Sequence, residues 1–303
     1  MKKNFDCTII GAGVAGITAA IYLKRWNFNI ILLEKNMPGG SINNTSSIEN
    51  YPGFKSINGS ELAMNLYDQI KKLDIPYQYA NVKEIKKEEE YFLLKTDTED
   101  IITDNIIIAT GRTPKMLGLK NEKSLIGNGI STCAICDGPL YKDKNVCIVG
   151  GGNSALEESI YLSKICKNVT IINRSDQLRA DISLQKRIQN ISNIHVCYNS
   201  KIIELQSKEG KLSSIIIQNE QQNYTYECDG LFIYIGFDPI YPKIDNLKLD
   251  NNYIVVNNKM ETNIKNIYAC GDIIKKDLYQ IITAASEGAI AANSIKMNFN
   301  KSE

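Results

Sequence analysis

Residues 7–35 read CTIIGAGVAGITAAIYLKRWNFNIILLEK, and residues 146–174 read VCIVGGGNSALEESIYLSKICKNVTIINR. A shift of 139 positions, from 7 to 146, aligns the two segments without a gap and superposes their glycines and their IYL triplets. Each copy predicts a buried strand, a glycine turn, a helix and a second strand, which is half of a doubly wound parallel sheet. The repeat therefore predicts an α/β protein with two Rossmann-like dinucleotide-binding domains.

The glycine spacing explains how each copy would bind a dinucleotide. Gly11 makes the tight turn, Gly13 lets the backbone approach a pyrophosphate, and Gly16 lets the helix pack closely on the strand. Free N–H groups at the start of the helix would then bind the phosphates. The second copy has equivalents of all three positions: Gly150, Gly152 and Ala155.

The two copies differ at the end of the second strand, where the adenosine ribose is recognised. Glu34 ends this strand in the first copy, and a carboxylate there favours FAD or NAD, whose ribose hydroxyls are free. The second copy has Asn173 followed by Arg174, with Arg179 five residues later. Guanidinium groups beside a neutral side chain suit a 2′-phosphate, as in NADP, although both arginines could instead be solvated surface charges.

Composition narrows the class of protein. The chain has 303 residues, and its 35 Lys and Arg nearly balance its 34 Asp and Glu, so we expect neither a nucleic-acid nor a membrane partner. The N-terminal apolar run resembles a signal peptide, but Asp6 and the fingerprint glycines argue against export, and we expect a cytoplasmic protein. In that compartment the six scattered cysteines are expected to be free and mostly buried.

The stretch 133–138, CAICDG, contains the one close cysteine pair. A zinc site needs about four ligands, and the single histidine, His195, lies in a strand-like segment, so no metal site is expected. A static disulfide is disfavoured in a reducing compartment, whereas Cys-x-x-Cys beside βαβ units indicates a redox couple. Asp137 is the adjacent candidate proton donor, and an alternative role for it is to cap the turn. Because hydride transfer to a disulfide is poor chemistry, a flavin is expected to mediate.

Two apolar strands that end in Gly and a following Pro mark the predicted domain boundaries. They are DNIIIATGRTP (104–114) and GLFIYIGFDPI (230–240). The first domain is therefore expected to comprise 1–113 and 241–303, with a second domain, 114–240, inserted into it. The segment 262–272 predicts another strand, which ends in Gly271 and Asp272.

Seven stretches occur in the order typical of one family, and over nearly its whole length the sequence resembles the low-molecular-weight thioredoxin reductases. The stretches are GAGVAG (11–16), GGSINNTSSIENYPG (39–53), IIIATG (106–111), CAICDG (133–138), GGGNSALEE (150–158), IGFDP (235–239) and ACGD (269–272).

The resemblance implies a homodimer, an FAD-binding first domain and an NADPH-binding second domain that carries the CxxC motif. It implies that FAD is bound by Gly11, Gly13, Ala15, Gly16, Glu34, Lys35, Gly39, Gly40, Ser41, Asn50, Val82, Thr110, Gly111, Asp272, Ile273, Tyr279, Gln280 and Ile281. It places NADPH near Gly150, Gly152, Asn153, Ser154, Ala155, Arg174, Arg179 and Gly236.

The same resemblance assigns the chemistry of the thiols. Cys136 would face the flavin, Cys133 would attack the disulfide of thioredoxin, and Asp137 would act as general acid. The inserted domain would rotate about Gly/Pro crossovers near 111–114 and 236–239.

The chain departs from the family pattern mainly around the pyridine nucleotide. Family members commonly have Asp at the position of Asn153, a His and a second Arg beside Arg174, and a basic residue at the position of Tyr279; Ser41 is a fourth difference, on the flavin side.

These departures leave the electron donor open. NADPH is favoured, and the alternatives are reduced ferredoxin, as in flavin thioredoxin reductases with a degenerate nucleotide site, or NADH in a reductase of another thioredoxin-like protein. A thiol-free ferredoxin–NADP reductase is disfavoured by Cys133 and Cys136. A redox-sensing module without turnover is the remaining alternative.

Overall fold

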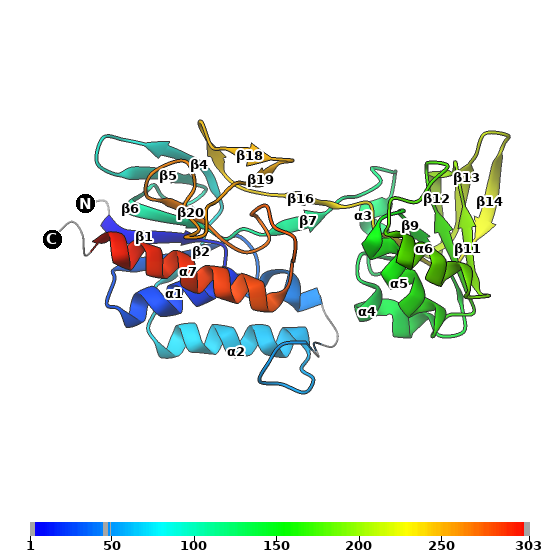
Figure 1. Ribbon diagram of the computed structural model, residues 1–303, viewed down its shortest axis with the longest axis horizontal. Helices are drawn as coiled ribbons and strands as arrows, with labels where there is room; N and C mark the ends of the chain where they lie inside the picture. The colour runs from blue at the N-terminus through cyan, green and yellow to red at the C-terminus, as the bar shows by residue number, and fades with distance from the viewer. Residues whose placement is uncertain (1–3, 45–47, 49, 300–303) are drawn as a thin grey trace. The chain divides into compact units, whose positions relative to one another are not determined.

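The computed structural model describes residues 4–44, 48 and 50–299, and it divides into two compact units (Figure 1). The first unit consists of residues 1–113 and 238–303, and the second unit of residues 114–237. The second crossover between the units thus falls between Phe237 and Asp238, three residues before the boundary at 240/241 expected from the sequence.

The first unit contains a mixed eight-stranded sheet with the order β17-β4-β5-β6-β1-β2-β3, and β20 pairs with β6 outside this path. The predicted fingerprint lies between the parallel strands β1 and β2. Strands β4, β5 and β6, which follow α2 and β3 along the chain, pair antiparallel with one another. The elements are β1 (Asn4–Ile10), α1 (Val14–Arg25), β2 (Ile30–Glu34), η1 (Gly40–Asn44), α2 (Gly59–Lys72), β3 (Tyr77–Tyr79), β4 (Val82–Lys87), β5 (Phe92–Thr96), β6 (Ile101–Ile108), β17 (Lys243–Ile244), β18 (Leu249–Asp250), β19 (Tyr253–Ile254), β20 (Ile267–Ala269) and α7 (Ile281–Phe299). Two further strands, β7 (Arg112–Pro114) and β16 (Phe237–Pro239), pair with each other and span the two unit boundaries.

The second unit contains a five-stranded sheet with the order β11-β10-β9-β15-β8 and a separate three-stranded antiparallel sheet, β12-β13-β14. All four pairings of the five-stranded sheet are parallel. The elements are α3 (Glu122–Leu125), β8 (Ile130–Ser131), α4 (Ala134–Asp137), η2 (Gly138–Tyr141), β9 (Asn145–Val149), α5 (Asn153–Ser163), β10 (Asn168–Ile172), α6 (Ile182–Gln189), β11 (Ile194–Cys197), β12 (Lys201–Lys208), β13 (Lys211–Gln218), β14 (Asn223–Glu227) and β15 (Gly230–Ile233).

The internal repeat of the sequence is also a repeat of structure. The shift of 139 positions takes the last residue of β1, Ile10, to the last residue of β9, Val149, and the first residue of α1, Val14, to the first residue of α5, Asn153. All five residues of β2 are buried, as expected for a parallel strand covered on both faces. The predicted α/β class with two Rossmann-like units is therefore confirmed.

The helix α1 packs tightly against α7 because both helices carry small residues where they meet (Figure 1). A Cβ on Gly288 would collide with the backbone oxygen of Ala15, and a Cβ on Gly271 would lie 2.9 Å from the Ala15 methyl group. Close backbone approach of this kind leaves no room for a larger residue. The C-terminal helix is thereby held against the helix that follows the first glycine turn.

We predict that Gly288→Ala lowers the free energy of unfolding by about 2 kcal/mol, because overpacking at the α1–α7 contact outweighs the gain of about 1 kcal/mol in helix propensity. Thermal unfolding of the full chain measures this. The control is Ser286→Ala, an exposed position on the same helix, which should be neutral or slightly stabilising. A Gly288→Ala variant as stable as the wild type would contradict the packing argument.

Candidate active site

The first fingerprint lies at the carboxyl ends of β1, β2, β6 and β20. Gly11 has φ +103°, and a Cβ there would lie within 3.0 Å of backbone atoms of Ala109 and Thr110. Gly13, the N-cap of α1, has nothing within 4 Å of its ideal Cβ position and no side chain caps the helix. An open, uncapped helix start with free N–H groups suits a bound pyrophosphate.

Glu34 lies at the end of β2, beside this helix start. Its Oε2 accepts a hydrogen bond of 2.7 Å from the Ala12 N–H, and its Oε1 accepts one of 2.8 Å from the Asn36 N–H. Both oxygens have further lone pairs, so the carboxylate can still accept ribose hydroxyls. Glu34 therefore both fixes the glycine turn and faces the predicted adenosine site.

The Gly-Gly turn that precedes η1 approaches the fingerprint directly. The Gly39 N–H donates to the Ala12 carbonyl at 2.7 Å, and Gly39 forms an isolated bridge with Gly13. Gly40 has φ +62° and a Cβ there would lie 3.4 Å from the Gly13 Cα. Ser41 follows in the exposed part of η1.

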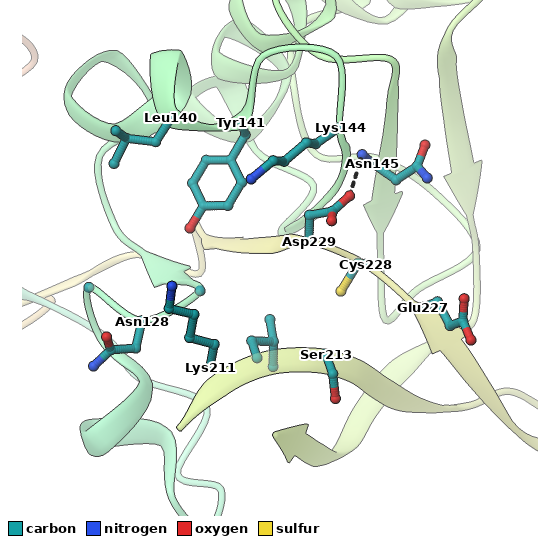
Figure 2. A pocket seen from close by; sticks show the side chains of 13 residues that line it. Asn128, Leu140, Tyr141, Lys144, Asn145, Lys211, Ser213, Glu227, Cys228 and Asp229 are labelled. Atoms are coloured by element: carbon teal, nitrogen blue, oxygen red, sulfur yellow. Dashed lines mark hydrogen bonds between the residues drawn. The ribbon is translucent and has the colours of Figure 1, made fainter. Parts of the chain in front are cut away.

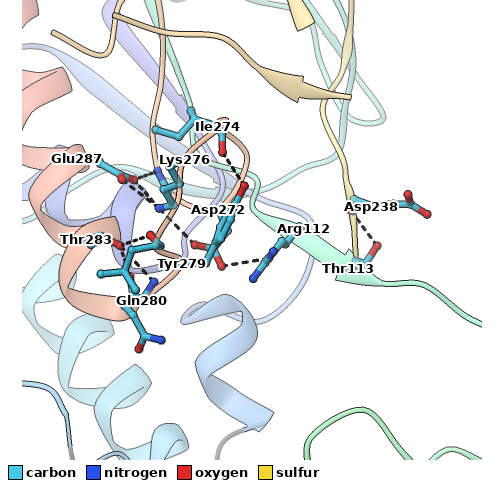
Figure 3. A network of polar contacts seen from close by, with 12 residues as sticks. Arg112, Thr113, Asp238, Asp272, Ile274, Lys276, Tyr279, Gln280, Thr283 and Glu287 are labelled. Carbon is cyan, nitrogen blue, oxygen red and sulfur yellow. Dashed lines mark hydrogen bonds and ion pairs between the residues drawn. The ribbon is translucent and has the colours of Figure 1, made fainter. Parts of the chain in front are cut away.

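The remaining predicted FAD residues gather from distant parts of the chain. The Asn50 amide donates to Gln280 Oε1 at 3.0 Å across 230 positions, and Thr110 Oγ1 is buried without a hydrogen-bond partner in the described structure. Asp272 carries ion pairs with Arg112 and Lys276 (Figure 3). Lys35 lies just after β2 and Val82 at the start of β4, while Gly111 follows β6 and Ile273 follows β20. Ile281 is the first residue of α7, and Tyr279 lies two positions before it.

The second fingerprint has the same geometry in the second unit. Gly150 has φ +139°, and a Cβ there would lie 3.0 Å from the Tyr234 carbonyl carbon. Gly152 is the N-cap of α5; nothing lies within 4 Å of its ideal Cβ position, and no side chain caps the helix. Ala155, at the position of the third glycine, is fully buried, and Ser154 is exposed in the first turn.

The loop between β10 and α6 is organised by amide side chains. The Asn173 amide nitrogen donates to the carbonyls of Ser175 at 2.8 Å and Gln177 at 3.0 Å, which a carboxylate could not do. Asn153 and Asp181 exchange two hydrogen bonds, at 2.9 and 2.8 Å, which ties this loop to the start of α5. The two departures from the family pattern at these positions thus have structural roles in the loop.

The predicted arginines lie on this loop. Arg174 and Arg179 are exposed, and no side-chain hydrogen bond or ion pair of either is seen in the described structure. The Arg179 N–H donates to the Gly151 carbonyl at 2.7 Å, which anchors its backbone beside the fingerprint. Gly236 lies apart from this group, at the crossover, with φ +109°.

The redox turn is a short helix, α4, whose N-terminal end is held by side chains from outside it. Cys133 is disulfide-bonded, and its N–H donates to Ser131 Oγ at 3.0 Å. The Ala134 N–H donates to Tyr234 Oη at 2.7 Å, and the Asp137 N–H donates to the Cys133 carbonyl at 3.1 Å. The side chain of Cys136 lies outside what the structure describes.

The other described cysteines behave differently. All six are free, and five of them are buried while Cys197 is half-buried, as the sequence predicted. Burial raises the pKa of Cys166 to about 11, so this thiol stays protonated at neutral pH. Thiolate chemistry is therefore disfavoured at Cys166.

Two side chains near the redox turn, Glu158 and Tyr234, were not predicted from the sequence to have a role; Tyr234 Oη accepts from the Ala134 N–H. Glu158 Oε2 is buried with no hydrogen-bond partner in the described structure, and burial, helped by the charge of Glu157, raises the pKa of Glu158 to about 7. Burial, then the charges of Glu158 and Asp137, raise the pKa of the Tyr234 phenol. Helical periodicity is the sequence pattern that could have indicated the burial of Glu158, because this residue follows the buried Ala155 by three positions on α5.

A pocket of about 570 Å³ in the second unit lies away from these residues (Figure 2). It opens near Asn145, the first residue of β9, whereas the fingerprint follows the last residue, Val149. Lys144, Lys211 and Asp229 line it, and none of the predicted site residues does.

Comparison with known proteins identifies the class. The family model for pyridine nucleotide-disulphide oxidoreductases matches residues 5–288, and the chain belongs to this family. It is 40% identical to the thioredoxin reductase of Bacillus subtilis, covering 97% of this chain and 95% of that protein. It is 41% identical to the thioredoxin reductase of Ureaplasma parvum, covering 96% of each.

Solved structures of thioredoxin reductases are also similar to this chain. A Lactococcus lactis thioredoxin reductase matches with a TM-score of 0.80 and 35% identity, covering 98% of this chain and 99% of that one. A Clostridium acetobutylicum ferredoxin-flavin thioredoxin reductase matches with a TM-score of 0.55 and 29% identity, covering 99% of this chain and 100% of that one. Among the described residues, no helix combines the length and apolarity that a membrane span requires.

We predict that Glu158→Gln makes stability less dependent on pH. A carboxyl whose pKa is higher in the folded state binds its proton more tightly there, so folding loses stability as pH rises from about 4.5 to about 7. The variant should be about 1–2 kcal/mol more stable than the wild type at pH 8, and the difference should vanish near pH 4.

Thermal unfolding at a series of pH values measures this difference. Glu220→Gln, an exposed position in the same unit, is the control and should show no pH-dependent difference. Parallel pH profiles for the wild type and Glu158→Gln would show that this carboxyl titrates normally.

Proposed function

We propose that the protein is a thioredoxin-disulfide reductase that binds FAD and takes electrons from NADPH. One observation carries the proposal: a disulfide-bonded Cys133 lies on the turn of a CxxC motif, in a unit that also has an open dinucleotide fingerprint. Family membership and the full-length similarity to thioredoxin reductases support it.

The first unit fits FAD. The open position at Gly13, the carboxylate of Glu34 and the unpartnered Thr110 hydroxyl are the features a dinucleotide with free ribose hydroxyls would use. When bound, FAD would accept a hydride from the nicotinamide and pass two electrons to the disulfide. Asn50, Asp272 and Gln280 would orient it.

The second unit fits a phosphorylated nucleotide. The glycine turn at Gly150 and Gly152 leaves room for a pyrophosphate at the uncapped start of α5. Arg174 and Arg179 offer the guanidinium groups that a 2′-phosphate would require. NADPH is therefore the proposed donor.

The thiols would then exchange with the protein substrate. Reduction of the disulfide takes two electrons and two protons and gives two thiols. The Cys133 thiolate would attack a thioredoxin disulfide, forming a mixed disulfide and releasing one thioredoxin thiolate, which takes a proton from Asp137. Attack by Cys136 on Cys133 would release the second thioredoxin thiolate and restore the disulfide.

We propose a homodimer in the cytoplasm. The exposed apolar side chains Tyr22 on α1 and Met297 on α7 belong to the first unit and are candidates for a subunit contact. Six free cysteines fit a reducing compartment. Sedimentation at micromolar concentration distinguishes a dimer from a monomer.

We predict that Cys133→Ser abolishes reduction of thioredoxin, with a loss of at least about 1,000-fold in turnover, while NADPH still bleaches the flavin. Oxygen cannot replace sulfur as the attacking atom in thiol–disulfide exchange. Cys197→Ser, at a half-buried free cysteine of the same unit, should keep full activity. Undiminished thioredoxin reduction by the Cys133→Ser variant would show that the proposal is wrong.

We predict that Arg174→Ala raises the KM for NADPH about tenfold and leaves the KM for NADH unchanged, because only NADPH has the 2′-phosphate. Anaerobic flavin bleaching with NADPH, NADH and reduced ferredoxin in turn identifies the donor. The control is Arg187→Ala, an exposed arginine on α6. Bleaching of the flavin by reduced ferredoxin but not by NADPH would show that ferredoxin is the donor, and it would leave the proposed disulfide chemistry unchanged.

A further inference from the structure

Four charged side chains of the first unit form a chain at the end of β20 (Figure 3). Arg112 Nε lies 3.6 Å from Asp272 Oδ2, and Lys276 Nζ lies 3.5 Å from Asp272 Oδ1. Lys276 Nζ also lies 2.8 Å from Glu287 Oε2, which accepts a hydrogen bond of 2.8 Å from the Gly271 N–H. Two cations and two carboxylates balance each other in this chain.

The two cations do not contribute equally to Asp272. Lys276 is 10% exposed and makes contacts of 2.8 and 3.0 Å with Glu287, which are shorter than its 3.5 Å contact with Asp272. Lys276 therefore mainly neutralises Glu287, whose pKa is raised by burial. Arg112 gives Asp272 a second cation, 3.6 Å from Oδ2.

An aromatic ring fixes the position of Arg112. The centre of its guanidinium lies 3.9 Å from the centroid of the Tyr279 ring, and Tyr279 packs in turn against Tyr253 with centroids 5.7 Å apart. A planar guanidinium can lie flat on an aromatic face and pair through its edge at the same time. Lys276 Nζ lies farther from the same ring, 5.4 Å from its centroid. Stacking thus holds the guanidinium where it meets Asp272.

Asp272 also has an accessible side. It follows β20, which pairs with β6, and so lies at the carboxyl edge of the sheet together with Gly11 and Gly13. Its side chain is 27% exposed. A carboxylate that is held on one side and open on the other can present an oxygen to a ligand hydroxyl.

We propose that Arg112 is a positioning residue for the cofactor, which acts through Asp272: stacked on Tyr279, it orients the carboxylate that binds a hydroxyl of FAD. This inference rests on the proposed binding of FAD in the first unit. Without Arg112, Asp272 would keep only Lys276, which it shares with Glu287, and would lose the contact to Oδ2. Arg112 is also the first residue of β7, so its contact with Asp272 holds the chain where it leaves the first unit.

The test is a double-mutant cycle on the affinity of the apoprotein for FAD, measured by quenching of flavin fluorescence. Arg112→Ala should raise the Kd for FAD about tenfold, and Arg112→Lys should fall between it and the wild type. In an Asp272→Asn background, Arg112→Ala should change the Kd less than about twofold, because the residue acts through that carboxylate.

The controls separate positioning from folding. Thermal unfolding of each apoprotein reports any loss of structure, and Arg25→Ala, an exposed arginine of the first unit, should leave the Kd unchanged. An equal effect of Arg112→Ala in both backgrounds, or no effect in the wild-type background, overturns the inference. If the Arg112→Ala apoprotein does not fold, Arg112→Lys completes the same cycle. A wild-type apoprotein that binds no FAD would overturn the proposed function as well.

Discussion

The structure of each unit depends on a backbone contact that only glycine allows, at the turn between the first strand and the first helix. In the first unit a Cβ on Gly11 would collide with the Ala109 carbonyl, and in the second a Cβ on the equivalent Gly150 would collide with the Tyr234 carbonyl. These contacts place the turn against the chain that follows the neighbouring strand, β6 in the first unit and β15 in the second. At the same turn the helix that follows starts without a side-chain cap, which makes this feature both a folding constraint and a candidate phosphate site.

Around this shared feature the two units have diverged in ways that suit different ligands. Glu34 ties the first turn through Ala12 and keeps a negative charge beside it, whereas Asn173 uses its amide to shape a loop that displays two arginines. The second unit also carries the redox turn, whose Ala134 N–H is held by Tyr234 at the end of β15. One repeated βαβ element therefore underlies the proposed cofactor site in one unit and the proposed donor site, beside the disulfide, in the other.

Much of this could be predicted from the sequence because the signals are local. The glycine spacing, the length of the apolar runs and the position of Glu34 gave the strand ends and helix starts, and the 139-residue shift matches the observed elements residue for residue at Ile10/Val149 and Val14/Asn153. Features that depend on packing could not be predicted. Arg112 lies over the Tyr279 ring across 167 positions of chain, and the buried, unpartnered Oε2 of Glu158 depends on contacts that no local pattern indicates.

The central claim is that a flavin and the Cys133 disulfide are two separate two-electron carriers in one chain. Anaerobic titration of the FAD-loaded protein with dithionite counts them directly. We expect uptake of about four electrons per chain, two for each carrier, and about two for Cys133→Ser. Uptake of only about two electrons by the wild-type protein would contradict it.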